Sequence, residues 1–421
     1  MLAQPIHRAK RIYHEYPKQF WVVVFASFID HVGGALVFPF FALYITHKFN
    51  VGMTQVGLLF AVFGVSNFIG SMLGGALTDH MGRKSVIIMG LIVSALTSLG
   101  MGLVGKLEYF YIMAIVTGIF ADMAGPAHQA MITDLLPEEK RSDGYGIMRV
   151  AMNLSVVIGP AVGGFLAAKS YMLLFGTDAV TSVITAIMFY FLVAETRPQK
   201  AENEASSEPA GSLFDSFKGY LVVWRDRPFI AFLVISIIIT IVYVQINSTL
   251  AVFLRDVRHL PTTSYGIVMS FNAVLVVLFQ FAITRRLSKY KPMLMMALGA
   301  LIYAIGFSMY GFVETFSMYL AAMGIITLGE MVVVPVAQTV VAKFSPEDMR
   351  GRYMAVFGIS WLIPGSVGPL LAGLVMDNAD PLWVWYGAGI LALVAMFGFL
   401  ILHLSQDEKP VSAPEIQLDT V

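Results

Sequence analysis

The sequence predicts an all-α integral membrane protein whose twelve transmembrane helices form two pseudo-symmetric halves of six. Of its 421 residues, 57% are hydrophobic and 13% are charged, whereas a soluble protein usually carries about 25% charged residues. Apolar runs of ~20 residues, which match a bilayer core of about 30 Å, recur along the whole chain. A repeat at half of the chain's length divides these runs into two sets of six.

Twelve apolar runs are predicted to cross the membrane. They lie near residues 20–46, 54–78, 85–105, 109–132, 143–169, 171–194, 228–254, 263–284, 292–312, 316–342, 350–376 and 381–404. Many contain Gly and Pro, which membrane helices tolerate because neighbouring helices satisfy the freed backbone groups.

The distribution of Lys and Arg predicts the orientation of these spans. With both termini in the cytoplasm, the inner segments hold 21 of the 27 Lys and Arg residues, the outer segments hold 5, and Arg149 lies within a span. Loops rich in Lys and Arg stay on the cytoplasmic side. We therefore expect a multi-pass cell-membrane protein with cytoplasmic termini. Its basic N-terminus runs into a full span, so no cleavable signal peptide is expected.

Polar stretches divide the chain into four parts. We expect a first six-helix half at 1–194, a cytoplasmic linker at 195–227, a second half at 228–404 and a disordered tail at 405–421. Five apolar residues of the linker recur at helical spacing, namely Leu213, Phe214, Phe217, Leu221 and Trp224. They predict an amphipathic helix on the inner leaflet, or alternatively an extension of span seven.

A shift of 209 residues superimposes the two halves of the sequence. Residues 126–164 then match residues 335–373 at 8 of 39 positions without a gap, including Gly159-Pro160 on Gly368-Pro369. Two halves with the same orientation are related by an axis along the membrane normal, as in some secondary transporters. In such proteins the substrate binds between the halves, near the bilayer midplane.

The loop after span two reads GALTDHMGRKS, residues 75–85. It resembles the G-x-x-x-D-R-x-G-R-K signature of the major facilitator superfamily. Five positions match, Gly75, Asp79, Gly82, Arg83 and Lys84, whereas His80 replaces the usual Arg. The resemblance implies the twelve-helix fold of that superfamily.

Span five reads GIMRVAMNLSVVIGPAVGG, residues 146–164, and resembles the glycine–proline signature of the superfamily's drug–proton antiporters. Ser155 stands where a glycine is usual, and the intramembrane Arg often found in span four is absent. Pro removes a backbone donor. We therefore expect the glycine and proline residues of this signature and of its repeat in span eleven to bend helices and shape the cavity rather than to bind substrate. These are Gly159, Pro160, Gly163, Gly164, Gly368 and Pro369.

Away from the ends of the predicted spans, five charged residues fall within them: Asp30, Asp122, Arg149, Asp178 and Glu330. Each costs at least ~2.5–3.5 kcal/mol at the bilayer centre, so each needs a reason. The resemblance implies that spans one, four, seven and ten line the cavity. Asp30, Asp122 and Glu330 lie on three of these spans, while span seven offers neutral Gln245 and Asn247 as polar cavity residues.

We expect Glu330 and Asp30 to be the main proton and substrate carboxylates, and Asp122 to pair with Arg149. Burial favours the protonated form of a carboxyl group and a nearby cation favours the ionised form, so one site can exchange a proton for a cationic substrate. The alternative is a hydrogen bond without a role in coupling. A structural role is expected for Asp178, and a packing role for His31 and His128.

The charged residues of the loop signature predict an inner gate. Asp79 can accept from the N-terminal end of span eleven, where the helix dipole favours an anion. Arg83 can pair with Asp134 at the inner end of span four, which would clamp the halves shut on the inside in the outward-open state. The alternative is simple anchoring by positive charge.

The resemblance favours a proton-driven exporter of lipophilic, often cationic compounds. Export of a single endogenous solute (a sugar, lipid or peptide) is the alternative, and a non-transporting membrane receptor is a third reading. We expect no enzyme activity, no cofactor and no metal site, and zero net charge argues against nucleic-acid binding. The expected partners of this monomer are small lipophilic substrates, protons and membrane lipids.

Overall fold

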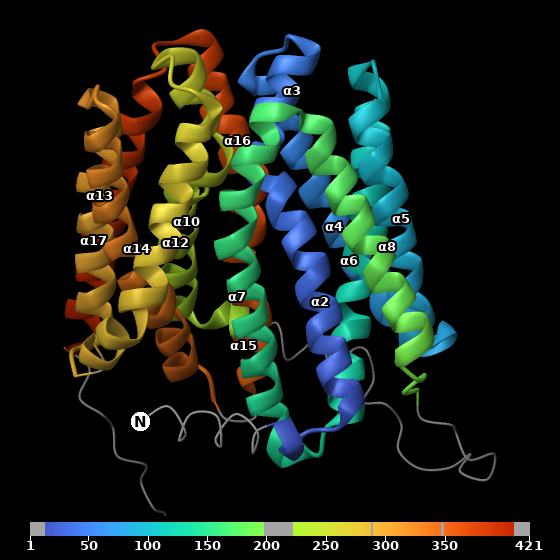
Figure 1. Cartoon of the computed structure of the whole chain (residues 1–421). Helices are drawn as coiled ribbons and strands as arrows, with labels where there is room; N and C mark the ends of the chain where they lie inside the picture. Colours follow the sequence, from blue (N-terminus) through green and yellow to red (C-terminus); the bar gives the residue numbers. More distant parts are fainter. Residues whose placement is uncertain (1–12, 198–221, 288, 347–348, 408–421) are drawn as a thin grey trace, which may run out of the picture.

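Long antiparallel helices make up the chain in the computed structural model, which describes residues 13–197, 222–287, 289–346 and 349–407 (Figure 1). Within these residues, 12 helical segments are long and apolar enough to cross a membrane. Each one overlaps a span predicted from the sequence, so the predicted fold class is confirmed.

The first half contains six spans. They are α2 (Lys18–Val37) continued by η1 (Phe38–Phe40) and α3 (Phe41–Phe49), then α4 (Met53–Met81), α5 (Arg83–Leu103), α6 (Leu107–Leu135), α7 (Glu138–Lys169) and α8 (Tyr171–Leu192). The second half contains the other six. They are α10 (Arg227–Ser248) continued by α11 (Leu250–Val252) and η2 (Phe253–Val257), then α12 (Thr262–Leu287), α13 (Pro292–Phe312), α14 (Phe316–Phe344), α15 (Arg350–Phe357) with α16 (Ile359–Asn378), and α17 (Trp383–Asp407).

Local signals set several helix ends. The side chain of Asp226 accepts a hydrogen bond from the Phe229 amide at 3.2 Å and so caps α10. A carboxylate at this position satisfies an amide that has no partner within the helix. Gly82 joins α4 to α5 with a φ of 90°, a backbone conformation that residues other than glycine rarely adopt. The match to the loop signature at Gly82 therefore has a backbone reason.

The helix bounds repeat at the interval predicted from the motifs. Helices α5 and α13 are offset by 209 residues at both ends, and so are α6 and α14. The internal repeat thus extends from short motifs to whole helices, and residues of one half have structural counterparts 209 positions away in the other.

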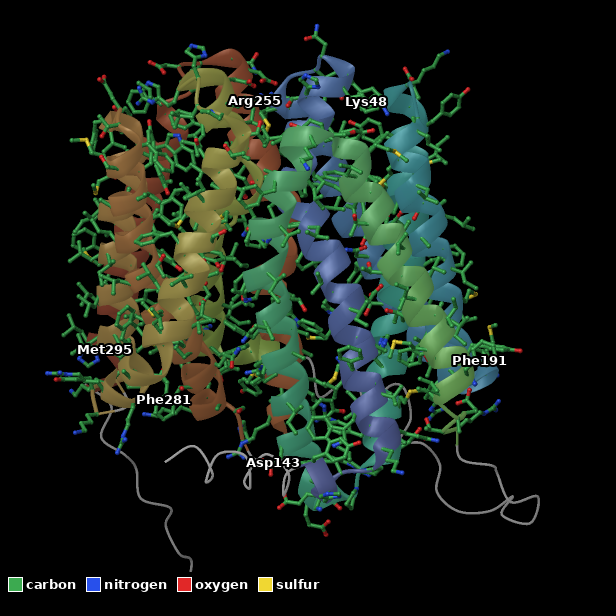
Figure 2. All side chains as sticks on the ribbon, in the orientation of Figure 1. Lys48, Asp143, Phe191, Arg255, Phe281 and Met295 are labelled. Atoms are coloured by element: carbon green, nitrogen blue, oxygen red, sulfur yellow. The ribbon has the colours of Figure 1, made fainter. Side chains whose placement is uncertain are left out.

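The helices begin and end at two faces of the bundle. We call the face that holds the start of α2 and the end of α17 the terminal face, and the opposite one the far face (Figure 1). Asp143 lies at the terminal face, whereas Lys48 and Arg255 lie at the far face (Figure 2). The predicted cytoplasmic location of the terminal face stays a prediction.

The two halves meet along two pairs of helices, α4 with α16 and α7 with α12. A Cβ atom at Gly57 would collide with the backbone of Leu370, and one at Gly164 would press on Gly266. Gly266 is the counterpart of Gly57, so glycine permits close backbone approach at both equivalent interfaces.

The other residues of the glycine–proline signature pack mainly within one half. Gly159 contacts Ala35, Gly163 contacts Phe40, and Gly368 contacts Val244. Pro160 and Pro369 lie inside α7 and α16. The structure therefore shows these glycines as points of close helix contact, and their expected role in bending stays a prediction.

Two predicted segments fall mostly outside the described residues. Residues 198–221 contain most of the expected amphipathic helix, and residues 408–421 contain most of the expected tail. Val222–Arg225, at the end of the linker, are helical. The linker and tail predictions are otherwise not tested.

Candidate functional site

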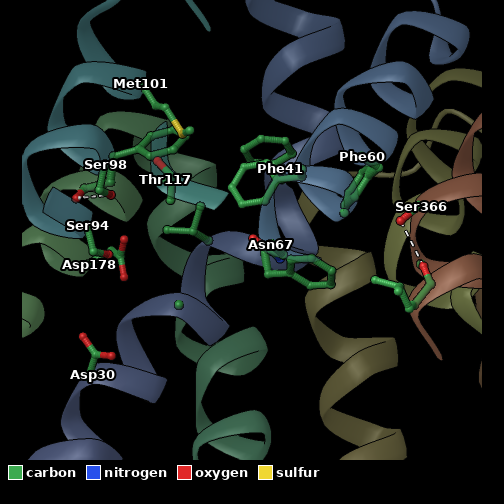
Figure 3. A pocket seen from close by; sticks show the side chains of 18 of the residues that line it. Asp30, Phe41, Phe60, Asn67, Ser94, Ser98, Met101, Thr117, Asp178 and Ser366 are labelled. Atoms are coloured by element: carbon green, nitrogen blue, oxygen red, sulfur yellow. Dashed lines mark hydrogen bonds between the residues drawn. The ribbon is translucent and has the colours of Figure 1, made fainter. Parts of the chain in front are cut away.

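A cavity of about 420 Å³ lies within the first half and is closed on one side by α16. Six aromatic side chains line it, namely Phe38, Phe41, Phe60, Phe63, Phe175 and Trp361. One end of the cavity carries Asp30 and Asp178 together with the hydroxyl groups of Ser94 and Ser98 (Figure 3). This aromatic cavity therefore combines an apolar body with an acidic end.

The acidic end is held by α2 and α8. The Ser182 hydroxyl donates to Asp30 Oδ1 at 2.9 Å. A Cβ atom at Gly33 would collide with the side chains of Thr181 and Asp178. The absence of a side chain at Gly33 thus makes room for the Asp178 carboxylate. The sequence favoured a purely structural role for Asp178, but this residue lines the cavity beside Asp30.

A second cavity of about 640 Å³ lies on the terminal side of the first and shares Asp30 and Ser94 with it. His31, His128 and Arg149 also line this space. Nδ1 of His31 lies 2.8 Å from the Ser27 carbonyl oxygen, and Nδ1 of His128 lies 2.9 Å from that of Ala124. Both imidazoles are therefore tied to their own helices, and Asp30 stands between the two cavities.

Arg149 makes a contact between the halves. Its Nη1 donates to Oε1 of Gln338 on α14 at 3.3 Å. The sequence predicted Asp122 as its partner, but the side chain of Asp122 lies outside the described part of the structure. The Asp122–Arg149 pair stays a prediction, whereas the contact with Gln338 was not foreseen.

Glu330 is the centre of a hydrogen-bond network in the second half. Its Oε1 accepts from the Tyr243 hydroxyl at 2.9 Å, and its Oε2 accepts from Asn272 Nδ2 at 2.8 Å. Asn272 Nδ2 also lies 2.9 Å from Thr327 Oγ1. The network therefore ties α10 and α12 to the carboxylate on α14. Sequence reasoning missed Tyr243 and Asn272, although both are polar residues within apolar spans.

The ring of Tyr243 links this network to the aromatic cavity. It stacks on Tyr303 with ring centres 6.0 Å apart, and it packs nearly perpendicular to Trp361, at 84°, with ring centres 5.8 Å apart. Trp361 lines the aromatic cavity. Glu330 itself lines neither of the two cavities. The rings of Tyr243 and Trp361 lie between it and the aromatic cavity.

The structure places the predicted cavity residues of span seven elsewhere. Gln245 is 4% exposed, donates to the carbonyl groups of Ile241 and Gly368, and accepts from Thr249. Its amide is thus used in joining α10 to α16. Asn247 is partly exposed but lines neither cavity. The aromatic cavity is lined mostly by the first half, and α16 of the second half supplies the remaining wall.

The loop signature forms a charged cluster at the terminal face. Arg83 Nε lies 3.0 Å from Asp134 Oδ2, so the predicted ion pair is present. The Glu195 carboxylate accepts from the backbone amides of Arg83 and Lys84 at 2.9 and 3.1 Å. All four residues belong to the first half or its end, so these described contacts lie within that half, and the predicted clamp between the halves stays a prediction. The surroundings of Gly75 and the side chain of Asp79 lie outside the described part.

Charged side chains join the two halves at the far face. The Asp377 carboxylate of α16 accepts from the amides of Met53 and Thr54 at 2.9 and 2.7 Å, at the start of α4. Arg255 donates to the Leu43 carbonyl at 3.0 Å and to the Thr46 hydroxyl at 2.8 Å. The sequence did not single out these residues. Their contacts hold the two halves together at the far face in this conformation.

Known proteins with similar sequences include an antiporter and a drug-resistance protein. The chain is 26% identical to a Na(+), Li(+), K(+)/H(+) antiporter of Planococcus maritimus, with 90% of this chain and 94% of the relative covered. It is 21% identical to the quinolone resistance protein NorA of Staphylococcus aureus, with 90% and 95% covered.

Solved structures share the fold. The nucleoside transporter NupG matches with a TM-score of 0.72 at 15% identity, over 92% of this chain and 99% of that one. A POT family transporter in complex with 5-aminolevulinic acid matches with a TM-score of 0.74 at 14% identity, over 93% and 96%.

The family model of the Major Facilitator Superfamily matches residues 23–369 and 295–420. These matches cover nearly all of the twelve spans and both copies of the internal repeat. Together with the helix count and the loop cluster around Arg83, they confirm the resemblance, and the chain belongs to the Major Facilitator Superfamily.

Proposed function

We propose that the protein exports lipophilic, often cationic compounds in exchange for protons by alternating access. The aromatic cavity that ends in Asp30 and Asp178 is the observation that carries this proposal. Aromatic faces attract cations electrostatically and also bury apolar surface. A lipophilic cation would place its charge at the two carboxylates and its body among the rings.

Glu330 is the proposed proton-coupling group, distinct from the substrate carboxylates. Its two described hydrogen-bond donors, Tyr243 and Asn272, are neutral. An ionisable group in a membrane span is costly when charged and is a recurrent element of proton relays. Trp361 lines the aromatic cavity and contacts Tyr243. Substrate that moves Trp361 would therefore also move Tyr243, which donates to Glu330.

The proposed orientation places the terminal face in the cytoplasm, because the segments on that side carry most of the Lys and Arg residues. The far-face contacts of Asp377 and Arg255 would then close the outer side. Substrate would enter from the cytoplasm or inner leaflet toward Asp30. Substrate binding with release of the proton, and a rearrangement of these contacts, would open the outer side. Protonation from outside would then return the protein to the conformation that is open to the cytoplasm.

Exchange of alkali-metal cations for protons is the second candidate, favoured by the similarity to the Planococcus maritimus antiporter. Carboxylate and neutral oxygen ligands suit hard cations. Asp30, Asp178, Ser94 and Ser98 supply such oxygens at one end of the aromatic cavity.

Transport in proteoliposomes with an imposed pH gradient tests the proposal and separates these candidates. The panel contains a lipophilic cation, a neutral lipophilic compound, Na⁺, K⁺ and a sugar. We expect the lipophilic cation to move against the direction of proton flow and to release protons when added. Proton release by Na⁺ or K⁺ alone would favour the second candidate, and accumulation in the direction of proton flow would reject antiport.

A further inference from the structure

A basic cavity of about 410 Å³ lies at the terminal face, among the ends of α10, α13, α14 and α17. Lys291, Lys343 and His403 line it together with apolar groups such as Met293 and Phe344. None of the described residues that line it is acidic. The cavity is separate from the proposed transport site and shares no residue with it.

The equivalent region of the first half contains acids as well as bases. There, Asp134 and Glu195 surround the start of α5, and Glu195 accepts from its first two amides. Helix α13 is the counterpart of α5, and Lys343 is the counterpart of Asp134. Lys291 precedes α13 without a side-chain cap. Acids thus accompany Arg83 and Lys84 at one helix start, whereas Lys343 stands in place of Asp134 at the other.

We propose that this basic cavity binds the phosphate of an anionic phospholipid headgroup. The start of a helix and lysine side chains both attract phosphate oxygens, and basic pockets between transmembrane helices recognise anionic headgroups. The bound phosphate would take the place that the Glu195 carboxylate holds at the start of α5. His403 adds an imidazole that can donate a further hydrogen bond.

The surroundings favour a lipid over free phosphate. A neighbouring hollow of about 180 Å³ shares Pro292 and Lys343 with the basic cavity and continues past Tyr290 and Met295. Helices α13 and α17 stand at one edge of the bundle (Figure 1), and Met295 lies at the rim of that edge (Figure 2). An acyl chain can therefore leave the headgroup site along an apolar surface.

Lipid binding by the purified full-length protein tests this inference. Native mass spectrometry would count retained phosphatidylglycerol or phosphatidylethanolamine, and thermal unfolding would be followed with each lipid and with inorganic phosphate. We expect preferential retention of phosphatidylglycerol and a higher unfolding temperature with it. The triple variant Lys291→Gln, Lys343→Gln and His403→Gln should reduce this retention by about tenfold or more.

Lys18→Gln is the matched control, because it removes an exposed charge at the terminal face of the other half. It should retain phosphatidylglycerol as the unchanged protein does. If the triple variant does not fold, Lys343→Gln alone should reduce retention several-fold and Lys343→Arg should restore it. Equal retention by Lys343→Gln and the unchanged protein would overturn the proposal, and so would stabilisation by phosphate that matches stabilisation by the lipid.

Discussion

The two halves share a backbone but differ in where they leave space. Gly34, Ser94 and Ser98 line the aromatic cavity of the first half. Their counterparts 209 residues later are Tyr243, Tyr303 and Phe307, all with large rings. Tyr303 and Phe307 are at most 1% exposed. The duplicated scaffold therefore holds a cavity in one copy and a packed aromatic core in the other.

The membrane acids differ between the halves in the same way. Asp30 and Asp178 correspond to Ile239 and Gly387, while Glu330 corresponds to Ala121. Each of these acids thus occurs in only one half. The donors to Asp30 and to Glu330 come from the same half as the acid that they contact. This division suggests that the first half binds the substrate and the second half holds the proton, and the following predictions test that division.

The largest effect is expected from Glu330→Gln. Glutamine can keep one acceptor for the Tyr243 hydroxyl but cannot exchange a proton, so proton-driven accumulation should be lost almost completely. Substrate binding, measured by equilibrium dialysis on the purified variant, should remain within about twofold because Glu330 lies outside the aromatic cavity. A folded variant with unchanged uphill export and pH dependence would contradict the assignment of the proton to the second half.

Asp178→Asn tests the substrate side of the comparison. Asp178 and a bound lipophilic cation would form a buried charge pair. Removing one charge of such a pair costs about 2–5 kcal/mol or more in protein complexes, so affinity for the cation should fall by at least about tenfold. Affinity for a neutral compound of similar shape should stay the same. Asp143→Asn, at the terminal face (Figure 2), is the matched control. An equal loss for the neutral compound would point to a structural role for Asp178.

Gly34→Tyr places the second half's residue into the first. A Cβ atom at Gly34 meets no other atom within 4 Å, so the ring has room to enter the cavity, although a large insertion commonly costs ~1–3 kcal/mol of stability. Binding of a bulky lipophilic cation should weaken about fivefold or more, as expected when about 1 kcal/mol of binding energy is lost. Gly34→Ala should bind normally. Unchanged binding by the tyrosine variant would place the substrate elsewhere.

The sequence predicted the fold better than the site, and for a physical reason. Span length and positive charge depend on local composition, and the 209-residue repeat depends on matching residue types. All three are therefore visible without tertiary structure. The partners Tyr243 and Asn272 of Glu330 come from two other spans, and only packing brings them within hydrogen-bond distance. Polar residues in apolar spans were the available signal, and that signal also pointed to Gln245, whose amide joins helices instead.

The repeat predicted a site between the halves, and the aromatic cavity is lined by both of them, although mostly by the first. Its actual position depends on residue size at equivalent positions, as with Ser94 and Tyr303. A comparison of counterparts in the repeat could have revealed this difference. The Asp377 cap could not be found in that way, because it depends on how α16 meets the start of α4.

The smallest effect concerns this far-face cap. Asp377→Asn keeps one acceptor oxygen but loses the charge that complements the start of α4. A cap residue contributes about 1 kcal/mol, so the far-face-open state should gain about fivefold in population. Because the chain has no cysteines, Ser94→Cys provides a single reporter in the aromatic cavity. Its labelling by an impermeant thiol reagent added at the far face should rise by a similar factor.

Asp380→Asn is the matched control for this cap, because Asp380 accepts from the Leu382 amide within its own half. It should leave the labelling rate unchanged. If Asp377→Asn also leaves that rate unchanged, the close packing of Gly57 on Leu370 is sufficient to hold the far face shut. Closure would then depend on the glycine contacts that both halves repeat, and not on a charge that occurs in one half alone. A rise with Asp377→Asn alone would instead show that the gate, like the proposed substrate and proton sites, depends on a residue placed in a single copy.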